Sequence, residues 1–519
     1  MTKSAASDDV EPSPDPGPCI RVRTVVLTGL TSHLITLTAA VTDGPPAVTL
    51  AGGGDRDDRP VRDRVRAGLA NSGQPNLSHR VEVRLDPPGS LLPPAAAVAV
   101  AVLAVTNGID PRRLASTAVI GEVGLDGSLR PTRGLLPAIE AARDHGIRQV
   151  IAPASALAEA ALVDGVDVLG AHSLAEVADW LRGDDDVLRR PGVNYVAVAE
   201  DLRPPARLLA DPVLLMVEVA AAGGHHVLFD AVDGEGSLLT ASWLHQLLPD
   251  LDLAQQRDVA AIRSLTGLRK DDAVLIGTPP LEFVHASFSP TTLVGGLTPG
   301  VVSRAHHGLL VARSIEEFGA SLVEGLRYVL LNRQVSLTRQ GDAVRYPAHL
   351  QLFAIHTRTS RSQRPPVSLA LLDVLDIQFR LTTSPAVASI PAHTTEAEQI
   401  SQVLAQSRSR IAAARSRAAT RWSSTASHGL GAAAELTNAA VPSDVLHSHR
   451  LTTGPIDHAF WVGALTLRGA DTVVRLAWTA ADLDCADRPD RGHVEAALEL
   501  HGASTLMAAR TSRDTPSSQ

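Results

Sequence analysis

A short loop near the middle of the chain has the layout of a phosphate-binding site. Within residues 227–248, an apolar strand leads into a loop with Gly234 and Gly236, and a helical pattern follows. In such a loop, backbone amides and the helix N-terminus point at the phosphates of a nucleotide. The chemistry also needs a lysine for the β- and γ-phosphates and a Ser or Thr hydroxyl for Mg²⁺. Ser237 stands at the lysine position and Leu238 at the hydroxyl position.

The charges around this loop disfavour a triphosphate. Asp230, Asp233 and Glu235 place three carboxylates beside it. Two like charges about 4 Å apart repel by roughly 4 kcal/mol at an effective dielectric near 20. The chain has only two lysines, Lys3 and Lys270, and neither belongs to this loop. From the loop alone, an ordinary strand, turn and helix is the simpler interpretation.

Phosphate binding by arginines is a second candidate chemistry. No acidic residue occurs from residue 399 to residue 434, and a separate loop carries Arg358, Arg361 and Arg364. Such arginines either contact nucleic-acid phosphates or form a solvated helix face, and the sequence leaves both interpretations open. The arginines of the longer stretch are Arg408, Arg410, Arg415, Arg417 and Arg421.

Histidine pairs occur at three places, but we predict no metal site. His225 and His226 are adjacent, as are His306 and His307, and a further pair lies near residue 447. A zinc site of a familiar kind combines histidines with nearby cysteines or with carboxylates at a fixed spacing. The only cysteines are Cys19 and Cys485, and no such spacing is present. These histidines are expected in loops and at strand edges.

The elements that position these residues follow from the apolar pattern. Alternation from Ile20 to Val26 predicts a strand, and Asp126-Gly127 predicts a hairpin. Later strands and helices alternate, which is typical of a mostly parallel sheet covered by helices, with the strands at 227–229, 309–312 and 350–355 adjacent. We expect a disordered tail at 1–19, an α+β domain at 20–183, a linker at 184–207, an α/β core at 208–384, a helical domain at 385–510 and a tail at 511–519.

Composition bounds the class of protein. The 519 residues are 45% hydrophobic and 20% charged, as in a globular chain, and the net charge of −9 argues against a surface that coats nucleic acid. The longest apolar run, residues 93–105, is too short to cross a bilayer. The first residues include no apolar segment of the signal-peptide kind, so we expect a cytoplasmic protein.

Several segments together resemble one known family. In order along residues 20–500, they include RDRVRAGLANSG, VIGEVGLDGSLRPTRGLLPAIEAAR, VEVAAAGGHHVL, GVVSRAHHGLL, YPAHLQLFA, LALLDVLDI and LTLRGADTVVRLAWTAADL. They are similar to the magnesium-chelatase-like AAA+ proteins of the ComM (YifB) family. The resemblance implies a Lon-protease-like N-terminal domain, an AAA+ P-loop-type core with a parallel sheet, and a helical lid. It also implies a hexameric ring that uses ATP and Mg²⁺ for branch migration of DNA in natural transformation.

The functional residues of that family are mostly replaced here. Its phosphate lysine and hydroxyl residue fall on Ser237 and Leu238. The acidic pair that binds Mg²⁺ in the family falls on Arg313 and Ser314. The sensor asparagine falls on Thr357, and the arginine of the L-L-D-R motif falls on Val374. Only the lid arginine has matching candidates here, which are Arg468 and Arg475.

The sequence therefore predicts a member of this family with a degenerate nucleotide site. Our leading hypothesis is a non-hydrolysing scaffold or regulatory relative of a branch-migration ATPase, with no cofactor, in a homo- or hetero-hexamer that could contact DNA through its basic segment. The alternatives are an active ATP-dependent motor with a rearranged site, or a decaying gene product without a role. Phosphoryl transfer depends on positioned positive charge, so the combined loss of lysine, metal ligands and arginine favours the first.

Overall fold

A computed structural model describes most of the chain, in two compact units. One unit comprises residues 1–196 and 263–274, and the other comprises residues 197–262 and 275–519. Residues 1–18, most of the predicted linker, the loop with Arg358, Arg361 and Arg364, and the predicted C-terminal tail lie outside the described residues. The described residues are 19–53, 57–74, 77–89, 91–107, 109, 111–191, 209–231, 234–267, 275–339, 342–357, 367–381, 396–423, 437–449 and 454–502.

The first unit is built on a seven-stranded mixed sheet with the order β3-β4-β2-β1-β5-β8-β9. The pairs β1–β2 and β2–β4 are antiparallel, whereas the other neighbours are parallel. The predicted strand from Ile20 is confirmed as β1, and the predicted hairpin at Asp126-Gly127 is confirmed as the antiparallel pair β6–β7. The strands are β1 Ile20–Thr28, β2 Thr31–Thr42, β3 Ala47–Ala51, β4 Arg80–Asp86, β5 Thr117–Val119, β6 Glu122–Val123, β7 Leu129–Arg130, β8 Gln149–Pro153 and β9 Asp167–Ala171.

Helix α2 lies at the centre of this unit. Its sequence AAAVAVAVLAVT is apolar on every face, and each residue from Ala95 to Val105 is buried. A helix that is apolar all round has to be covered on all sides, and its small residues allow close contact with β1, β2, α1 and α5. The other helices are α1 Arg59–Asn71, α3 Leu135–Asp144, α4 Leu157–Ala160 and α5 Leu174–Arg182, with α2 at Ala95–Thr106.

The second unit contains a five-stranded, wholly parallel sheet with the order β11-β12-β15-β10-β16. The predicted adjacency of the strands at 227–229, 309–312 and 350–355 is confirmed, since β12, β15 and β10 are neighbours in that order. A separate antiparallel ribbon joins β13 to β14. The strands are β10 Val227–Ala231, β11 Leu281–Val284, β12 Leu309–Ala312, β13 Gln334–Arg339, β14 Asp342–Pro347, β15 Gln351–Thr357 and β16 Ile377–Arg380.

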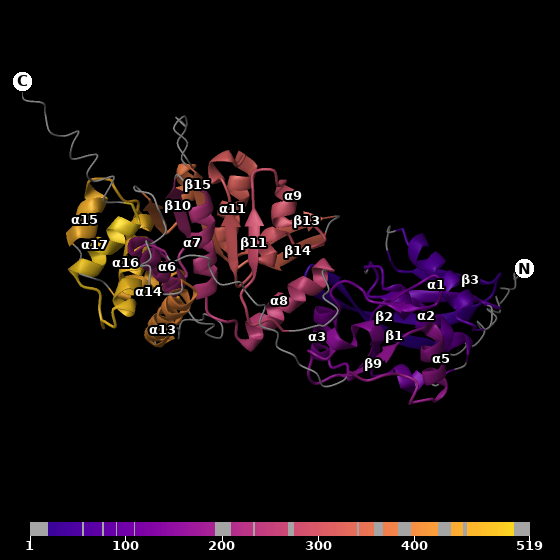
Figure 1. Cartoon of the computed structure of the whole chain (residues 1–519). Helices are drawn as coiled ribbons and strands as arrows, with labels where there is room; N and C mark the ends of the chain where they lie inside the picture. The colour runs from indigo at the N-terminus through magenta and orange to yellow at the C-terminus, as the bar shows by residue number, and fades with distance from the viewer. Residues whose placement is uncertain are drawn as a thin grey trace, which may run out of the picture. The chain divides into compact units, whose positions relative to one another are not determined.

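Helices cover this sheet and continue to the C-terminal part of the chain (Figure 1). The expected mixed α/β class with a parallel sheet and a helical C-terminal region is confirmed. The helices are α6 Asp211–Gly223, α7 Gly234–Leu247, α8 Leu253–Thr266, α9 Pro290–Val294, α10 Val301–Arg304, α11 Ala320–Asn332, α12 Leu369–Leu372, α13 Glu396–Ser423, α14 Ser443–Ser448, α15 Gly454–Trp461, α16 Leu467–Leu483 and α17 Arg491–Leu500.

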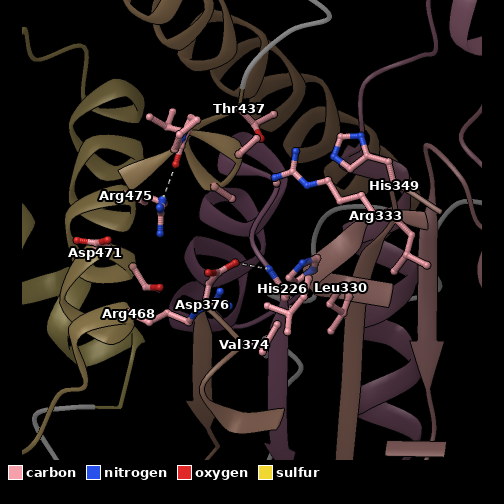
Figure 2. A pocket seen from close by; sticks show the side chains of 18 of the residues that line it. His226, Leu330, Arg333, His349, Val374, Asp376, Thr437, Arg468, Asp471 and Arg475 are labelled. Carbon is pink, nitrogen blue, oxygen red and sulfur yellow. Dashed lines mark hydrogen bonds between the residues drawn. The ribbon is translucent and has the colours of Figure 1, made fainter. Parts of the chain in front are cut away.

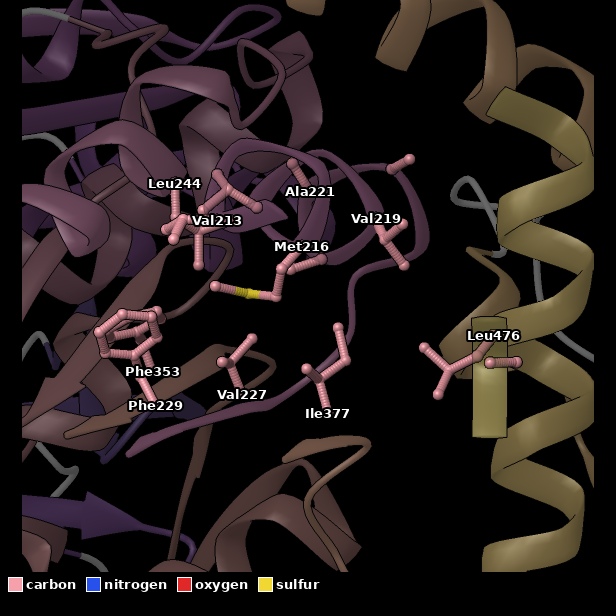
Figure 3. Close-up of a cluster of buried hydrophobic side chains, with 14 of the residues drawn as sticks. Val213, Met216, Val219, Ala221, Val227, Phe229, Leu244, Phe353, Ile377 and Leu476 are labelled. Carbon is pink, nitrogen blue, oxygen red and sulfur yellow. The ribbon is translucent and has the colours of Figure 1, made fainter. Parts of the chain in front are cut away.

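The C-terminal helices and the parallel sheet share one hydrophobic core. Met216 of α6 packs among Val227 and Phe229 of the sheet, and the same cluster extends to Leu476 of α16 (Figure 3). Fully burying an apolar side chain of this size contributes about 1.5–3 kcal/mol. The helical region is therefore held on the sheet by burial, which does not depend on any catalytic side chain. Among the described residues, no helix is long and apolar enough to cross a membrane.

Candidate functional site

The predicted phosphate-binding residues gather at the carboxyl edge of the parallel sheet. Because the five strands are parallel, the residues that end β10, β12, β15 and β16 lie along the same edge. Helix α7 begins at Gly234, three residues after the end of β10, so its N-terminus belongs to this edge. Val232 and Asp233, between β10 and α7, lie outside the described residues. The strand and the helix expected on either side of the phosphate-binding loop are thus present.

A carboxylate occupies the middle of this edge. Asp230, the next-to-last residue of β10, is only 8% exposed. Its Oδ2 accepts a hydrogen bond from Arg380 Nε at 2.9 Å, and its Oδ1 lies 2.9 Å from His356 Nδ1. Arg380 is the last residue of β16 and His356 is the next-to-last residue of β15, and these two strands flank β10. Asp230 is therefore held in place by groups from both neighbouring strands and cannot readily turn away.

The residues at the lysine and hydroxyl positions are part of helix α7. Ser237 is 1% exposed, and Leu238 packs against the hydrophobic core described above. The first turns of α7 are further held by Thr240, whose hydroxyl donates to the carbonyl of Gly236 at 2.8 Å. Neither Ser237 nor Leu238 offers a positive charge to an anion at this edge.

The three other predicted positions near this edge carry no metal-binding carboxylate of their own. Arg313 follows β12 and is exposed, and Ser314 adopts a left-handed backbone with φ of 53°. The backbone N–H of Thr357 points at Glu316, whose two carboxylate oxygens lie 3.4 and 3.3 Å away. Glu316 is therefore a second carboxylate at the edge where phosphates would lie. Glu316 follows Arg313 and Ser314, the positions of the family's acidic pair, with only Ile315 between.

The predicted lid arginines lie at the opposite edge of the sheet. Arg468 and Arg475 of α16 line a pocket of about 330 Å³, together with residues that precede strands β10, β15 and β16 (Figure 2). Val374, at the position of the family's motif arginine, lines the same pocket and is 8% exposed. Arg475 donates to the carbonyl of Val441 at 3.1 Å and to Ser443 Oγ at 3.2 Å. Within one chain, these arginines and the N-terminus of α7 belong to different edges, and nucleotide sensing by them stays a prediction.

Asp376, at the floor of this pocket, is strongly held in its charged form. Burial by itself would raise its pKa, but His225 at 3.6 Å and the backbone N–H of His226 at 2.9 Å lower the pKa to about 2. A carboxylate whose pKa falls on folding stabilises the protein above its unfolded pKa of about 3.9. That contribution is lost as the pH falls through the folded value.

We therefore predict that Asp376→Asn is most destabilising above about pH 4. Between about pH 4 and pH 2, the difference in unfolding free energy between native and variant protein should shrink by about 1.4 kcal/mol per pH unit. Urea unfolding of both proteins at several pH values measures this difference. A difference that stays constant down to pH 3 would contradict the lowered pKa of Asp376.

The five predicted DNA-contacting arginines all donate to acceptors inside the protein. Arg408 donates to the carbonyl and side chain of Gln246, and Arg410 pairs at 2.7 Å with the buried Glu218. The remaining three bind acceptors on α6 and α16: Arg415 the carbonyl of Ala221, Arg417 the carbonyl of Asp482, and Arg421 the Asp482 carboxylate. This face is more than a solvated helix surface, because its arginines connect α13 to three other helices. Contact with DNA stays a prediction.

One histidine pair approaches a metal-binding arrangement but lacks the right donor. Possible ligand atoms of His306, His307 and Asp258 lie within 4.8 Å of one another. However, Nδ1 of His306 accepts the backbone N–H of His349 at 2.9 Å, which places the proton of the neutral ring on Nε2. A protonated ring nitrogen cannot bind a metal. This set therefore does not fit a metal ion.

Comparisons with known proteins cover nearly the whole chain. Residues 213–383 match the family described as magnesium chelatase, subunit ChlI, residues 37–156 match subunit ChlI of Mg-chelatase, and residues 402–501 match the ChlI C-terminal family. An uncharacterized protein of Mycobacterium tuberculosis is 35% identical over 510 residues, which is 92% of this chain and 98% of that protein. YifB of Salmonella typhimurium is 26% identical over 94% of this chain and 97% of its own length. Competence protein ComM of Haemophilus influenzae is 28% identical over 64% of this chain and 70% of its own length.

The chain belongs to the magnesium-chelatase-like family of ComM and YifB. The family assignment made from sequence motifs is thus confirmed. The Lon-like character of the first unit and the loss of nucleotide chemistry stay predictions. Asp230 was predictable from the sequence as a charge beside the loop, whereas His356 and Arg380 were not, because this ComM/YifB-family chain brings them to Asp230 from 126 and 150 residues away. Polar residues at the ends of neighbouring strands were the available signal.

Proposed function

We propose that this protein is a non-hydrolysing member of the ComM/YifB family that serves as a scaffold or regulatory subunit. The observation that carries the proposal is Asp230, fixed between Arg380 and His356 at the edge where the family would bind phosphates. In a working site of this class, a lysine and bound Mg²⁺ balance the charge of the triphosphate. Here the same edge carries the carboxylates of Asp230 and Glu316, with neutral Ser237 at the lysine position.

A nucleotide phosphate at this edge would be repelled by carboxylates at the place where its binding requires positive charge. A carboxylate and a phosphate about 4 Å apart repel by roughly 4 kcal/mol at an effective dielectric near 20. Asp230 cannot avoid this by rotating without breaking two hydrogen bonds, and the guanidinium of Arg380 is already paired with it. A hydrogen bond to a charged group is worth about 1.5–3 kcal/mol, so the rearrangement adds a cost of its own.

The setting of this role follows from the family. We propose that the protein assembles into a ring, a hexamer of its own copies or one mixed with an active relative, in the cytoplasm. Such a subunit would contribute its folded core and helical region to the assembly and leave ATP turnover to its partners. Any DNA contact would then serve positioning, and the ATP and Mg²⁺ used by the family are not expected to bind this chain.

The test is nucleotide binding and turnover by the purified protein with Mg²⁺, with and without branched DNA. We expect no turnover above a protein-free control and no calorimetric signal of tight binding. Micromolar binding of Mg²⁺-ATP, or turnover stimulated by DNA, would refute the proposal.

A rearranged motor is the second candidate, and Glu316 makes it testable. Its carboxylate lies at the carboxyl edge, beside the N–H of Thr357, where it could hold Mg²⁺ in place of the family's acidic pair. If turnover is found, Glu316→Gln should abolish it, because the amide is a much weaker Mg²⁺ ligand. Glu317→Gln, one residue further on and exposed, is the matched control and should leave any such turnover unchanged.

A further inference from the structure

The pocket at the amino edge of the parallel sheet has polar walls from separate parts of the second unit. Its volume of about 330 Å³ is at the small end of the range for ligand pockets, roughly 300–1,000 Å³. Arg333 reaches in from the end of α11, and Arg475 lies on the facing wall formed by α16 (Figure 2). The carboxylate of Asp376 lies between them at the floor.

The acidic residues of the pocket already have partners of their own. Asp376 accepts the backbone N–H of His226 at 2.9 Å and faces His225. Asp471 lies 2.9 Å from His447 Nε2. The third, Asp373, accepts the hydroxyl of Thr466 at 2.6 Å and lies 4.0 Å from Arg468.

Among the described residues, neither of the two facing arginines is hydrogen-bonded to a carboxylate. Arg475 donates to two neutral acceptors, the carbonyl of Val441 and the hydroxyl of Ser443. Across the described residues, no hydrogen bond or ion pair joins the Arg333 guanidinium to a carboxylate, and the charge of Asp376 acts on it only from a distance. Burial lowers the pKa of both arginines, although the charge of Asp376 acts in the opposite direction on each of them. For Arg475, the charge of Asp471 also raises the pKa, whereas the charges of Arg468 and Arg333 lower it. Two positive charges thus share a partly desolvated pocket.

The backbone conformation of Arg333 is also unusual. Arg333 is the C-cap of α11 with φ of 54° and ψ of 20°, in the left-handed region. Glycine is the usual residue at such a cap because a Cβ is strained there. Residues with a strained backbone tend to cluster at ligand-binding and active sites.

The donors around the arginines complete an anion-binding surface. His226 accepts the backbone N–H of Leu352 at its Nδ1, at 3.2 Å, so its neutral ring carries a proton on Nε2 and can donate from there. The hydroxyl of Thr437 also lines the pocket. Planar guanidinium groups match the oxygens of phosphate groups, and two of them together suit a dianion.

We propose that this pocket binds the phosphate group of a small molecule through Arg333 and Arg475, with His226 and Thr437 as further donors. The site lies at the edge of the sheet opposite to Asp230 and the N-terminus of α7, so it does not depend on whether a nucleotide binds there. Its ligand would bridge the sheet and α16, and would therefore strengthen the packing of the helical region on the core.

The test is binding of inorganic phosphate and of pyrophosphate to the full chain. Calorimetry and thermal unfolding at constant ionic strength measure this binding. Arg333→Gly is the key variant, because it removes the guanidinium and also relieves the backbone strain, so it should fold at least as well as the native protein. We expect it to weaken phosphate binding about 10- to 100-fold, the loss of one or two charged hydrogen bonds. Arg475→Gln should weaken binding to a similar degree.

Two controls separate this site from other sources of binding. Arg327→Ala removes a half-buried arginine of the same helix that does not line the pocket, and Ser237→Ala alters the first turn of α7. Both should bind phosphate as the native protein does. Equal binding by native protein and Arg333→Gly, or no binding by native protein, would overturn the proposal. So would a response to malonate as large as that to phosphate, or stabilisation by Mg²⁺ alone, because those results assign the pocket to a carboxylate or to a cation.

Discussion

Replacing Arg421 by alanine is expected to lower the free energy of unfolding by about 3–5 kcal/mol. Arg421 of α13 pairs with Asp482 of α16, and the Asp482 side chain is fully buried. The Asp482 carboxylate also accepts a hydrogen bond from Asn438 Nδ2 at 2.9 Å, so it is fixed in place. Removal of the arginine would leave a buried charge with too few partners, which is the costly way to break an ion pair.

Aromatic contacts add to the role of this arginine. The guanidinium carbon of Arg421 lies 4.1 Å from the centroid of the Trp478 ring and 5.4 Å from that of Trp422. Such a cation–π contact contributes about 0.5–2 kcal/mol. Arg421 therefore loses both an ion pair and ring contacts when it is truncated.

Urea unfolding of Arg421→Ala beside Arg491→Ala measures the effect. Arg491 also pairs with a carboxylate, that of Glu495, but its side chain is 83% exposed, so its loss should cost less than about 1 kcal/mol. Equal losses in the two variants would contradict a structural role for Arg421. The result also bears on DNA binding, because a variant of the arginine segment that binds DNA poorly could simply be unfolded. Any such comparison needs a folding control.

Phe229→Ala is expected to lower the free energy of unfolding by about 3–5 kcal/mol. Phe229 is fully buried in the middle of β10, with its ring centroid 5.7 Å from that of Phe353 and 5.8 Å from that of Phe379 (Figure 3). These two rings belong to the strands on either side, so the cavity would open in the centre of the sheet. Neighbouring strands cannot close around it without losing their register.

The control for this prediction is Phe283→Ala in β11, at the edge of the same sheet. Phe283 is 43% exposed, so its truncation removes less buried surface and should cost clearly less. Thermal or urea unfolding with a circular-dichroism readout compares the two variants. Equal losses of unfolding free energy in Phe229→Ala and Phe283→Ala would contradict a structural role for the stacked rings around Phe229. The expected result supports the view that the core keeps its fold through apolar packing, whatever its nucleotide chemistry.

The strands and the family were predictable from the sequence alone. The run VLF of β10, the run LLVA of β12 and the run LFA of β15 are apolar, as is typical of strands buried on both faces. The Asp126-Gly127 hairpin depends on backbone preferences of two adjacent residues, and Gly127 indeed has φ of 80°. Both signals are local, since they concern residues that are neighbours along the chain.

The partners of the charged residues were decided only by the tertiary structure. Arg415 donates to a carbonyl 194 residues away, and Arg421 pairs with a carboxylate 61 residues away. The same holds for Asp230, whose two partners come from the strands that flank β10, and for Arg475, which lies at the amino edge of the sheet. A charge pattern along one segment carries no information on which distant acceptor will face it, because that depends on strand order and helix packing. Apolar periodicity specifies which side of an element is buried, whereas the identity of the group on the other side is a property of the folded chain.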